Sequence, residues 1–283
     1  MAITLENFKN LVLPQYLIVI LFSLFSSYIV ISGTLSLFLV LPFLAISFAM
    51  FALNITNNIV DIDLDKINKP KRPLPSGKMS VKEAKMLVVV CVFLSLLFSS
   101  LTNWITFVMI IVFHILSVLY SIPPLRLKRF LFADNIIGSI IYGAFPFVIA
   151  WSLLSEEFSI IFLIFFSGLI FAIASIKDLE DVKGEKEKGI DTLPIRIGVK
   201  NSILFTVSIM FVVLLMMFAS SLLGMIDFIY IYPSLVSLLI WILFYVKSRK
   251  VNIEKNVITQ SKIMTTSMIV VAVYYVSFAL ASL

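Results

Sequence analysis

Long apolar runs, separated by short polar breaks, make up most of this 283-residue chain. An α-helix needs about 20 apolar residues to cross a bilayer, because each residue adds about 1.5 Å. We count nine runs of about this length. They cover residues 11–32, 35–60, 83–101, 104–121, 134–154, 158–177, 200–222, 225–246 and 261–282. The pattern predicts an all-α, polytopic membrane protein with nine transmembrane helices, forming a single domain over residues 1–283.

The composition agrees with a protein that is surrounded by lipid. Hydrophobic residues make up 61% of the chain and charged residues 13%. A soluble domain could not cover so much apolar surface. The formal net charge is +6, and in so apolar a chain basic cytoplasmic loops and anionic lipid explain it better than nucleic acid does. We therefore expect the lipid bilayer as a partner, and no nucleic acid.

The positive charges lie in alternate connections between the apolar runs. All 22 Lys and Arg fall at Lys9 and within residues 66–85, 126–129, 177–200 and 247–262. The opposite connections, such as residues 32–34 and 101–103, contain none. Because short cytoplasmic loops keep Lys and Arg, we expect a multi-pass protein of the cell membrane. Its N-terminus and acidic motifs should be cytoplasmic and its C-terminus outside.

A weak internal repeat appears in the long polar connections. The second and the sixth apolar runs each end in an acidic cluster, which a basic loop and a Leu-Pro pair follow. The clusters are Asn57, Asp61 and Asp65 in the first case and Asp178, Asp181 and Glu185 in the second. The repeat predicts two similar halves, about 11–121 and 134–246, plus a ninth helix at 261–282. The two clusters would then face each other across a central cavity.

The first cluster has the spacing of a row of metal ligands. Asn57, Asp61 and Asp65 are four residues apart, which on a helix places them on one face, about 6 Å from each other. Acidic groups at the edge of hydrocarbon are costly and need a compensating cation. Oxygen ligands without thiol or imidazole favour Mg²⁺. The alternative is a solvated acidic loop that pairs with nearby Lys side chains.

The second cluster strengthens the metal hypothesis. Asp178, Asp181 and Glu185 have i, i+3 and i+7 spacing, which again gives one helical face. Two opposed oxygen-rich rows suit two metal ions that clamp a diphosphate. Basic residues that can neutralise phosphate oxygens are interleaved with both rows along the chain. They are Lys69, Lys71, Arg72, Arg126, Lys128, Lys177 and Arg196.

The only cysteine and the only histidine lie inside apolar runs. Cys91 cannot form an internal disulfide, and a small packed side chain is its simplest interpretation. His114 has no second imidazole or thiol with which to bind a metal. We expect His114 to form a hydrogen bond between two helices.

Three segments resemble the signatures of one known family. Residues 57–77 read NNIVDIDLDKINKPKRPLPSG, residues 120–128 read YSIPPLRLK, and residues 177–185 read KDLEDVKGE, continuing to DTLPIRIG at 191–198. In order and spacing they are similar to the motifs of the UbiA superfamily of intramembrane prenyltransferases. The resemblance covers essentially the whole chain and implies nine helices around a central cavity.

The chain departs from the family pattern at three places. Asn58 stands where the family usually has Asp, and Glu185 replaces the last Asp of the second signature. Ile173-Ala174-Ser175-Ile176 stands where several archaeal lipid-forming members carry an Arg-Glu pair. The first two departures keep oxygen ligands, although Asn58 carries less charge.

The resemblance implies transfer of an isoprenyl group, geranylgeranyl or similar, from a prenyl diphosphate to a lipophilic acceptor. It implies Mg²⁺ as the cofactor, with Asp61, Asp65, Asp178 and Asp181 as catalytic residues. The expected metal ligands are Asn57, Asp61, Asp65, Asp178, Asp181 and Glu185. The expected substrate-binding residues are Asn57, Lys69, Arg72, Tyr120, Arg126, Lys128 and Lys177. The base that removes the final proton is not assigned.

Several alternatives stay open at this point. We place an aromatic or quinone-type acceptor slightly ahead, because residues 120–124 resemble members that prenylate homogentisate or chlorophyllide and because the Arg-Glu pair of the lipid-forming members is absent. The first alternative is a geranylgeranylglyceryl phosphate geranylgeranyltransferase of archaeal lipid synthesis. An ion or solute transporter is more remote, since intramembrane carboxylates and repeated halves also mark ion pathways. A protein that only hydrolyses the diphosphate, or that is a scaffold, would share the same fold.

Overall fold

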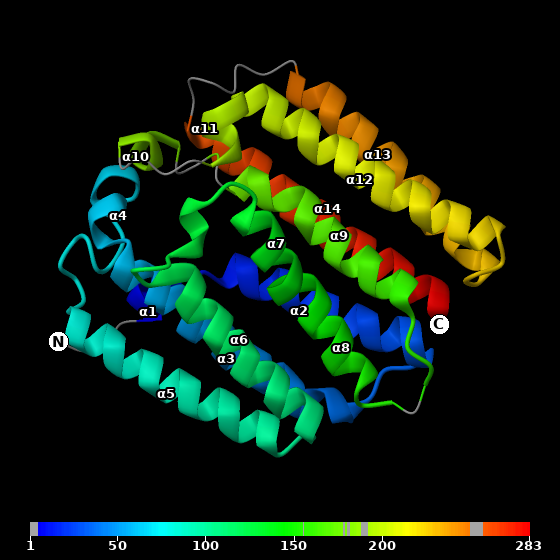
Figure 1. Ribbon diagram of the computed structural model, residues 1–283, viewed down its shortest axis with the longest axis horizontal. Coiled ribbons are helices and arrows are strands. Elements are labelled where there is room, and N and C mark those ends of the chain that lie inside the picture. The colour runs from blue at the N-terminus through cyan, green and yellow to red at the C-terminus, as the bar shows by residue number, and fades with distance from the viewer. Residues whose placement is uncertain (1–4, 155, 178, 180–181, 188–191, 250–256) are drawn as a thin grey trace.

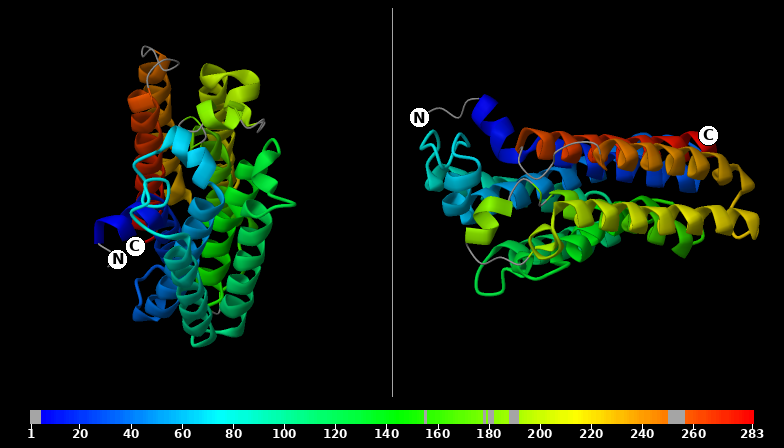
Figure 2. Two further views of the ribbon diagram at one scale, coloured as in Figure 1. Left: turned by 90° about the vertical axis from the view of Figure 1, so that its left-hand side faces the viewer. Right: turned by 90° about the horizontal axis from the view of Figure 1, so that it is seen from above.

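The computed structural model describes residues 5–154, 156–177, 179, 182–187, 192–249 and 257–283. All the regular elements among them are helices, so the predicted all-α class is confirmed for this part of the chain. The long helices lie side by side along one direction (Figures 1 and 2).

The first half of the chain contains four long helices. After the short helix α1 (Leu5–Val12) come α2 (Pro14–Ser32), α3 (Val40–Val60), α5 (Val81–Ser100) and α6 (Trp104–Ser121), with a 3-10 turn before α3 and the short helix α4 (Ile62–Asn68) after it. Local signals set the ends. Gly33, with φ of 66°, ends α2 because glycine adopts a left-handed conformation easily. Ser80 and Glu83 form a capping box that starts α5.

The second half begins after the basic 3-10 turn η2 (Leu127–Arg129). Its fifth span is α7 (Ala133–Ser139), a π-helical turn η3 (Ile140–Ala144) and α8 (Phe145–Trp151). The remaining helices are α9 (Ile160–Lys177), α10 (Val182–Glu187), α11 (Leu193–Ile197), α12 (Val199–Leu222), η5 (Phe228–Tyr230), α13 (Ile231–Arg249) and α14 (Val257–Ser282). The short helices α10 and α11 lie between the sixth and seventh long helices.

Each of the nine predicted ranges lies on a helical segment, but nine spans are not confirmed as a count. Six segments of the described chain are long and apolar enough to cross a membrane. They are Leu37–Val60, Trp104–Ser121, Ala133–Trp151, Val199–Leu222, Phe228–Val246 and Thr265–Ser282. The bent pair Glu6–Val12 and Tyr16–Ser32 would make a seventh. The apolar part of α9, Ile160–Ala174, is shorter than a typical span.

The helices share two main hydrophobic clusters. One is formed mainly by residues of α9, α12, α13 and α14, with Val19 and Val30 of α2 and Phe147 of α8. The other joins residues of α2, α3, α6, α7 and α8. Helix α2 contacts α14 as well as α3 and α8, so it packs between the two groups. Large apolar side chains such as Val89, Val212 and Leu243 are exposed on the outside of the long helices. This outer surface fits lipid rather than water as its solvent.

Gly143 lets the fifth span approach α9 closely. A Cβ atom at this position would lie 2.6 Å from the carbonyl oxygen of Phe166 and from the Cα of Ser167. Gly143 lies in the π-helical turn η3, a kind of turn that is frequent at functional sites. Helix α9 also contacts α7, so α7, η3 and α9 form one packed wall.

The two ends of the bundle differ in character. Helices α1, α4, α10 and α11 lie at one end, and the C-terminal end of α14 lies at the other (Figures 1 and 2). The end with the short helices carries the first acidic motif, Asn57 to Asp65. The predicted orientation across the membrane and the two similar halves stay predictions.

Candidate functional site

The first acidic row keeps its register across a break between two helices. Helix α3 ends at Val60 and α4 begins at Ile62, so the single continuous helix that we expected is interrupted at Asp61. Asp61 has φ of −94° and ψ of 11°, outside the helical region. Its amide still bonds to the Asn57 carbonyl at 2.9 Å, and the Asp65 amide bonds to the Asp61 carbonyl at 2.7 Å. The three side chains therefore keep the spacing of successive helical turns.

Asp61 is held by two cations from a distant segment. Arg126 donates a hydrogen bond to its Oδ1 at 2.8 Å, and Lys128 donates to its Oδ2. The Asp61 side chain is 13% exposed. Arg126 has φ of 39°, and this left-handed residue starts the turn η2 that carries Lys128. The structure thus joins three predicted site residues whose segments are far apart in the sequence.

Asp65 is paired locally and is almost fully buried. Arg72 Nη1 donates to Asp65 Oδ2 at 2.8 Å and to Asn58 Oδ1 at 3.1 Å. Asn58 Nδ2 in turn donates to the backbone carbonyls of Leu11 at 3.0 Å and Asn54 at 2.7 Å. An amide can donate and accept at once, whereas a carboxylate can only accept. The departure from the family pattern at Asn58 therefore joins Arg72 to the C-terminal turn of α1.

Two consecutive residues at the end of α6 connect the row to α7. Ser121 Oγ donates a hydrogen bond to Asn57 Oδ1. The hydroxyl of Tyr120, which is 8% exposed, donates to Asp134 Oδ1 at the start of α7. Ser121 and Asp134 were not among the predicted site residues. A signal for Asp134 exists in the sequence, because it is the only acidic residue between Glu83 and Glu156.

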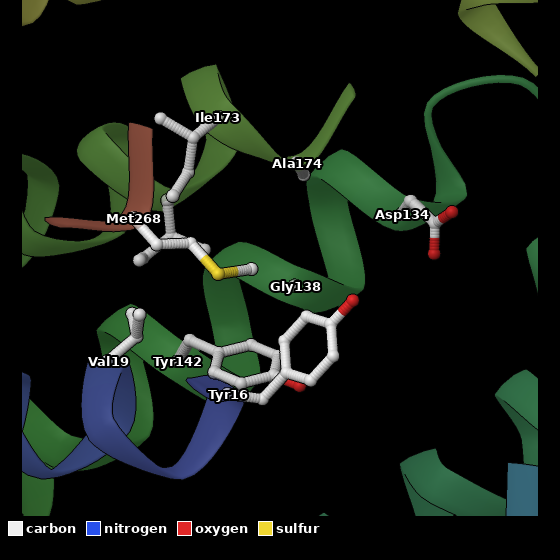
Figure 3. A pocket seen from close by; sticks show the side chains of 9 residues that line it. Tyr16, Val19, Asp134, Gly138, Tyr142, Ile173, Ala174 and Met268 are labelled. Atoms are coloured by element: carbon white, nitrogen blue, oxygen red, sulfur yellow. The ribbon is translucent and has the colours of Figure 1, made fainter. Parts of the chain in front are cut away.

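A cavity of about 50 Å³ lies among α2, α7, η3, α9 and α14. Figure 3 shows Tyr16 and Tyr142 on one side of it, Met268 and Ile173 on the other, and Asp134 at one end. The rings of Tyr16 and Tyr142 are 6.4 Å apart, centroid to centroid. Apart from Asp134 and the two tyrosine hydroxyls, the side chains that line the cavity are apolar. The cavity can therefore take an apolar group whose polar end lies near Asp134.

The second acidic cluster falls mostly outside the described part of the chain. Asp178 and Asp181 lie outside the described residues, and so do the side chains of Lys177 and Glu185. The helix that carries Glu185 is α10, and α10 packs against α4, which carries Asp65 (Figure 1). Helix α10 therefore lies beside the first motif.

A basic groove of about 360 Å³ opens beside the first motif. It is lined by Asn10 of α1, by Asn68, and by residues 69–72. These include the predicted Lys69, Lys71 and Arg72, and no carboxylate lines the groove among the described residues. Cations at this place raise the positive potential next to Asp65, which favours an anionic ligand.

The donor set fits Mg²⁺ by its chemistry. Asn57, Asp61 and Asp65 offer one amide and two carboxylate groups, the oxygen ligands that Mg²⁺ prefers. No group of three or more His, Cys, Asp or Glu side chains is gathered among the described residues. The predicted ligand set is completed only by Asp178, Asp181 and Glu185.

His114 does not take part in this site. Its Nε2, on α6, lies 2.7 Å from Ser95 Oγ on α5, which is the hydrogen bond between two helices that we expected.

Comparison with known proteins gives consistent results. Residues 16–277 match the family model of the UbiA prenyltransferase family. A digeranylgeranylglyceryl phosphate synthase of Methanococcus aeolicus is 34% identical over 200 residues, which cover 70% of this chain and 69% of that protein. The synthase of the same name from Sulfurisphaera tokodaii is 29% identical, over 64% of this chain and 66% of its own length. The chain thus spans slightly less than two thirds of the latter protein.

Solved structures share the fold. A UbiA homologue from Archaeoglobus fulgidus, bound to DMAPP and Mg²⁺, superposes with a TM-score of 0.76 at 19% identity, over 98% of both chains. A structure of digeranylgeranylglyceryl phosphate synthase superposes with a TM-score of 0.67 at 23% identity, also over 98% of both chains. At these identities the likeness concerns the arrangement of the helices.

Proposed function

This chain belongs to the UbiA prenyltransferase family, and from that premise we propose that it is an intramembrane transferase of archaeal-type lipid synthesis. It moves a geranylgeranyl or similar chain from a prenyl diphosphate to the free hydroxyl of geranylgeranylglyceryl phosphate. The observation that carries the proposal is the hydrogen-bonded cluster in which residues 57–72 meet residues 120–134 beside an apolar cavity. Because the chain belongs to a family of prenyltransferases, we set aside the alternative of an ion or solute transporter.

The choice of acceptor reverses our preference from the sequence. We placed an aromatic or quinone-type acceptor ahead because of the Tyr-Ser-x-Pro-Pro motif at residues 120–124. In the structure Tyr120 donates a hydrogen bond to Asp134, and Ser121 donates one to Asn57. Both residues of the motif are therefore bonded within the site, and the motif does not indicate which acceptor binds. The relatives named digeranylgeranylglyceryl phosphate synthase support the glycerol phosphate acceptor instead.

The metal site would use both acidic motifs. Asn57, Asp61 and Asp65 would hold Mg²⁺ together with Asp178, Asp181 and Glu185. Bound Mg²⁺ supplies positive charge that makes the diphosphate a better leaving group. The relative from Archaeoglobus fulgidus that binds DMAPP and Mg²⁺ supports this assignment.

The basic residues would bind the oxygens of the diphosphate. Arg126 and Lys128 already lie at Asp61, and Lys69 and Arg72 line the groove beside Asp65. Lys177 completes the basic set, while Tyr120, which the sequence also placed at the substrate, donates its one hydroxyl proton to Asp134. Preorganised donors at the place where negative charge develops are a large source of rate enhancement.

The apolar cavity would exclude water from the reacting carbon. Val19, Ile173 and Met268 offer hydrocarbon to the prenyl chain. Water that reached an allylic cation would add to it and give the prenyl alcohol. Apolar side chains that exclude water therefore favour transfer to the acceptor.

An acceptor panel tests the proposal. Purified protein in lipid vesicles would receive labelled geranylgeranyl diphosphate with geranylgeranylglyceryl phosphate, with an aromatic acid, or with no acceptor, each with Mg²⁺ or with EDTA. We expect a labelled diether phosphate that needs Mg²⁺ and the glycerol phosphate acceptor. Product formed only with the aromatic acceptor would overturn the choice of acceptor, and pyrophosphate release at equal rates without any acceptor would favour hydrolysis.

A further inference from the structure

We propose that Asp134 is the general base that takes the proton from the acceptor hydroxyl. The assignment rests on the proposed transfer reaction and supplies the base that the sequence did not assign. Its basis is the position of Asp134, which lies both in the polar cluster and at the end of the apolar cavity.

The reacting carbon has to lie at the boundary between these two environments. In a prenyl diphosphate, C1 is bonded to the diphosphate on one side and to an apolar chain on the other. The diphosphate belongs with the Asn57–Asp65 row, and the first carbons of the chain belong at the apolar cavity of about 50 Å³. The acceptor oxygen attacks C1, so its proton is released close to the same boundary.

Asp134 lies at that boundary by two observed connections. Its Oδ1 accepts a hydrogen bond from Tyr120, and the neighbouring Ser121 donates to Asn57 of the acidic row. Its side chain also lines the cavity, together with Tyr16 and Tyr142 (Figure 3). Among the described residues that line this cavity, Asp134 is the one carboxylate.

The other carboxylates near the site have different partners. Asp61 is paired with Arg126 and Lys128, and Asp65 is paired with Arg72. Tyr120 is a neutral donor, and a carboxylate has lone pairs for more than one hydrogen bond. Tyr120 thus acts as a positioning residue that fixes the direction of the Asp134 carboxyl group.

The acceptor oxygen forms a bond to C1, and the bond between C1 and the diphosphate oxygen breaks, with its electron pair leaving on the diphosphate. The proton of the acceptor hydroxyl moves to the Asp134 carboxylate. Asp134 returns that proton to water when the diether product leaves.

An isotope experiment separates proton removal from ionisation. The substrate is geranylgeranyl diphosphate with ¹⁸O in the bridging position. Reversible ionisation scrambles this label into the non-bridging positions without an acceptor, whereas ether formation also needs the base. The two rates are measured on one preparation of the full-length protein in vesicles with Mg²⁺.

We expect Asp134→Asn to lower ether formation by about 10²- to 10⁴-fold, the usual contribution of a general base. Scrambling of the ¹⁸O label should stay within about threefold of wild type, because the amide oxygen can still accept from Tyr120. Asp134→Glu should recover part of the ether formation. Tyr120→Phe should lower it less than Asp134→Asn does.

If Asp134→Asn does not fold, Asp134→Ala with added formate replaces it, since a small carboxylate can enter the space and restore the lost proton acceptor. Recovery of ether formation by formate supports the assignment. Ether formation near the wild-type rate in Asp134→Asn, equal loss of scrambling and transfer, or no recovery with formate would overturn it. Failure of the proposed function is distinct, because it would appear in the wild-type protein as transfer to another acceptor or to none.

Discussion

Asp61 and Asp65 are four residues apart, yet their cations come from different parts of the chain. Asp61 binds Arg126 and Lys128, which are 65 and 67 residues away in the sequence. Asp65 binds Arg72, seven residues away. The side chain of Asp61 is 13% exposed and that of Asp65 is 3% exposed.

The difference separates two roles within one motif. Arg72 also binds Asn58, and Asn58 holds the last turn of α1, so the Asp65 pair is part of the fold. The Asp61 pair instead brings the loop after α6 onto the acidic row. We expect changes at Asp61 to act mainly on activity, and changes at Arg72, a proposed diphosphate ligand, to lower stability as well as activity.

The largest effect should follow from Asp61→Ala. The change removes a proposed Mg²⁺ ligand and leaves Arg126 and Lys128 without their carboxylate. We expect turnover to fall by about 10²- to 10³-fold or more, the cost of losing one strong electrostatic contact at a reacting centre. The measurement is the initial rate of labelled product formation.

Asp63→Asn is the matched control for Asp61→Ala. Asp63 lies in the same motif, but its side chain is 75% exposed and it pairs with Lys66 on the surface of α4. It should keep near-normal turnover. Equal losses in the two variants would mean that the net charge of the segment matters, and not the position of Asp61.

Arg72 and Arg126 have similar exposure but pair with different carboxylates. The side chains of Arg72 and Arg126 are 21% and 22% exposed. Arg72→Ala removes the hydrogen bonds from Arg72 to the buried Asp65 and to Asn58, and it should lower the free energy of unfolding by about 3 kcal/mol. Arg126→Ala should cost less stability, because Asp61 keeps Lys128. Thermal unfolding in detergent compares the two, and equal shifts would contradict the separation of roles.

Asn58→Asp should have a moderate effect. The carboxylate can still accept from Arg72 but cannot donate to the Leu11 carbonyl, so one buried acceptor loses its partner. We expect a loss of about 1–2 kcal/mol and faster protease cleavage near α1. Unchanged stability combined with tighter Mg²⁺ binding would show instead that Asn58 is a weakened metal ligand.

The smallest effect should come from His114→Leu. His114 bonds to Ser95 between α5 and α6, away from both acidic motifs. Loss of one such bond costs about 0.6–1 kcal/mol in a membrane protein, and turnover should stay within about twofold. Loss of activity without loss of stability would give His114 a role that the structure does not indicate.

The sequence predicts the helices well because apolar runs of membrane length have few alternatives. The acidic row was predictable too, since its spacing of four residues survives the break at Asp61. The break itself was not predictable, because it accompanies two cations that arrive from residues 126–128. Such long-range pairing leaves no local pattern.

Asn58 and Asp134 show a second limit. Asn58 looked like a weakened ligand, and only the position of α1 explains why an amide suits this place. Asp134 lies at the start of an apolar run, where a single carboxylate has no spacing to interpret. Its partner Tyr120 and the cavity beside it come from other helices. The second motif, with Asp178 and Asp181, stays a prediction.

The central claim is that the two acidic motifs bind one metal-bound diphosphate. An experimental structure of the protein with Mg²⁺ and a non-reactive thio analogue of geranylgeranyl diphosphate tests it most directly. The account predicts Asp61 and Asp181 oxygens at about 2.1 Å from metal ions that share this diphosphate. A structure in which Asp181 points away, and in which the diphosphate binds without Asp61, would contradict it.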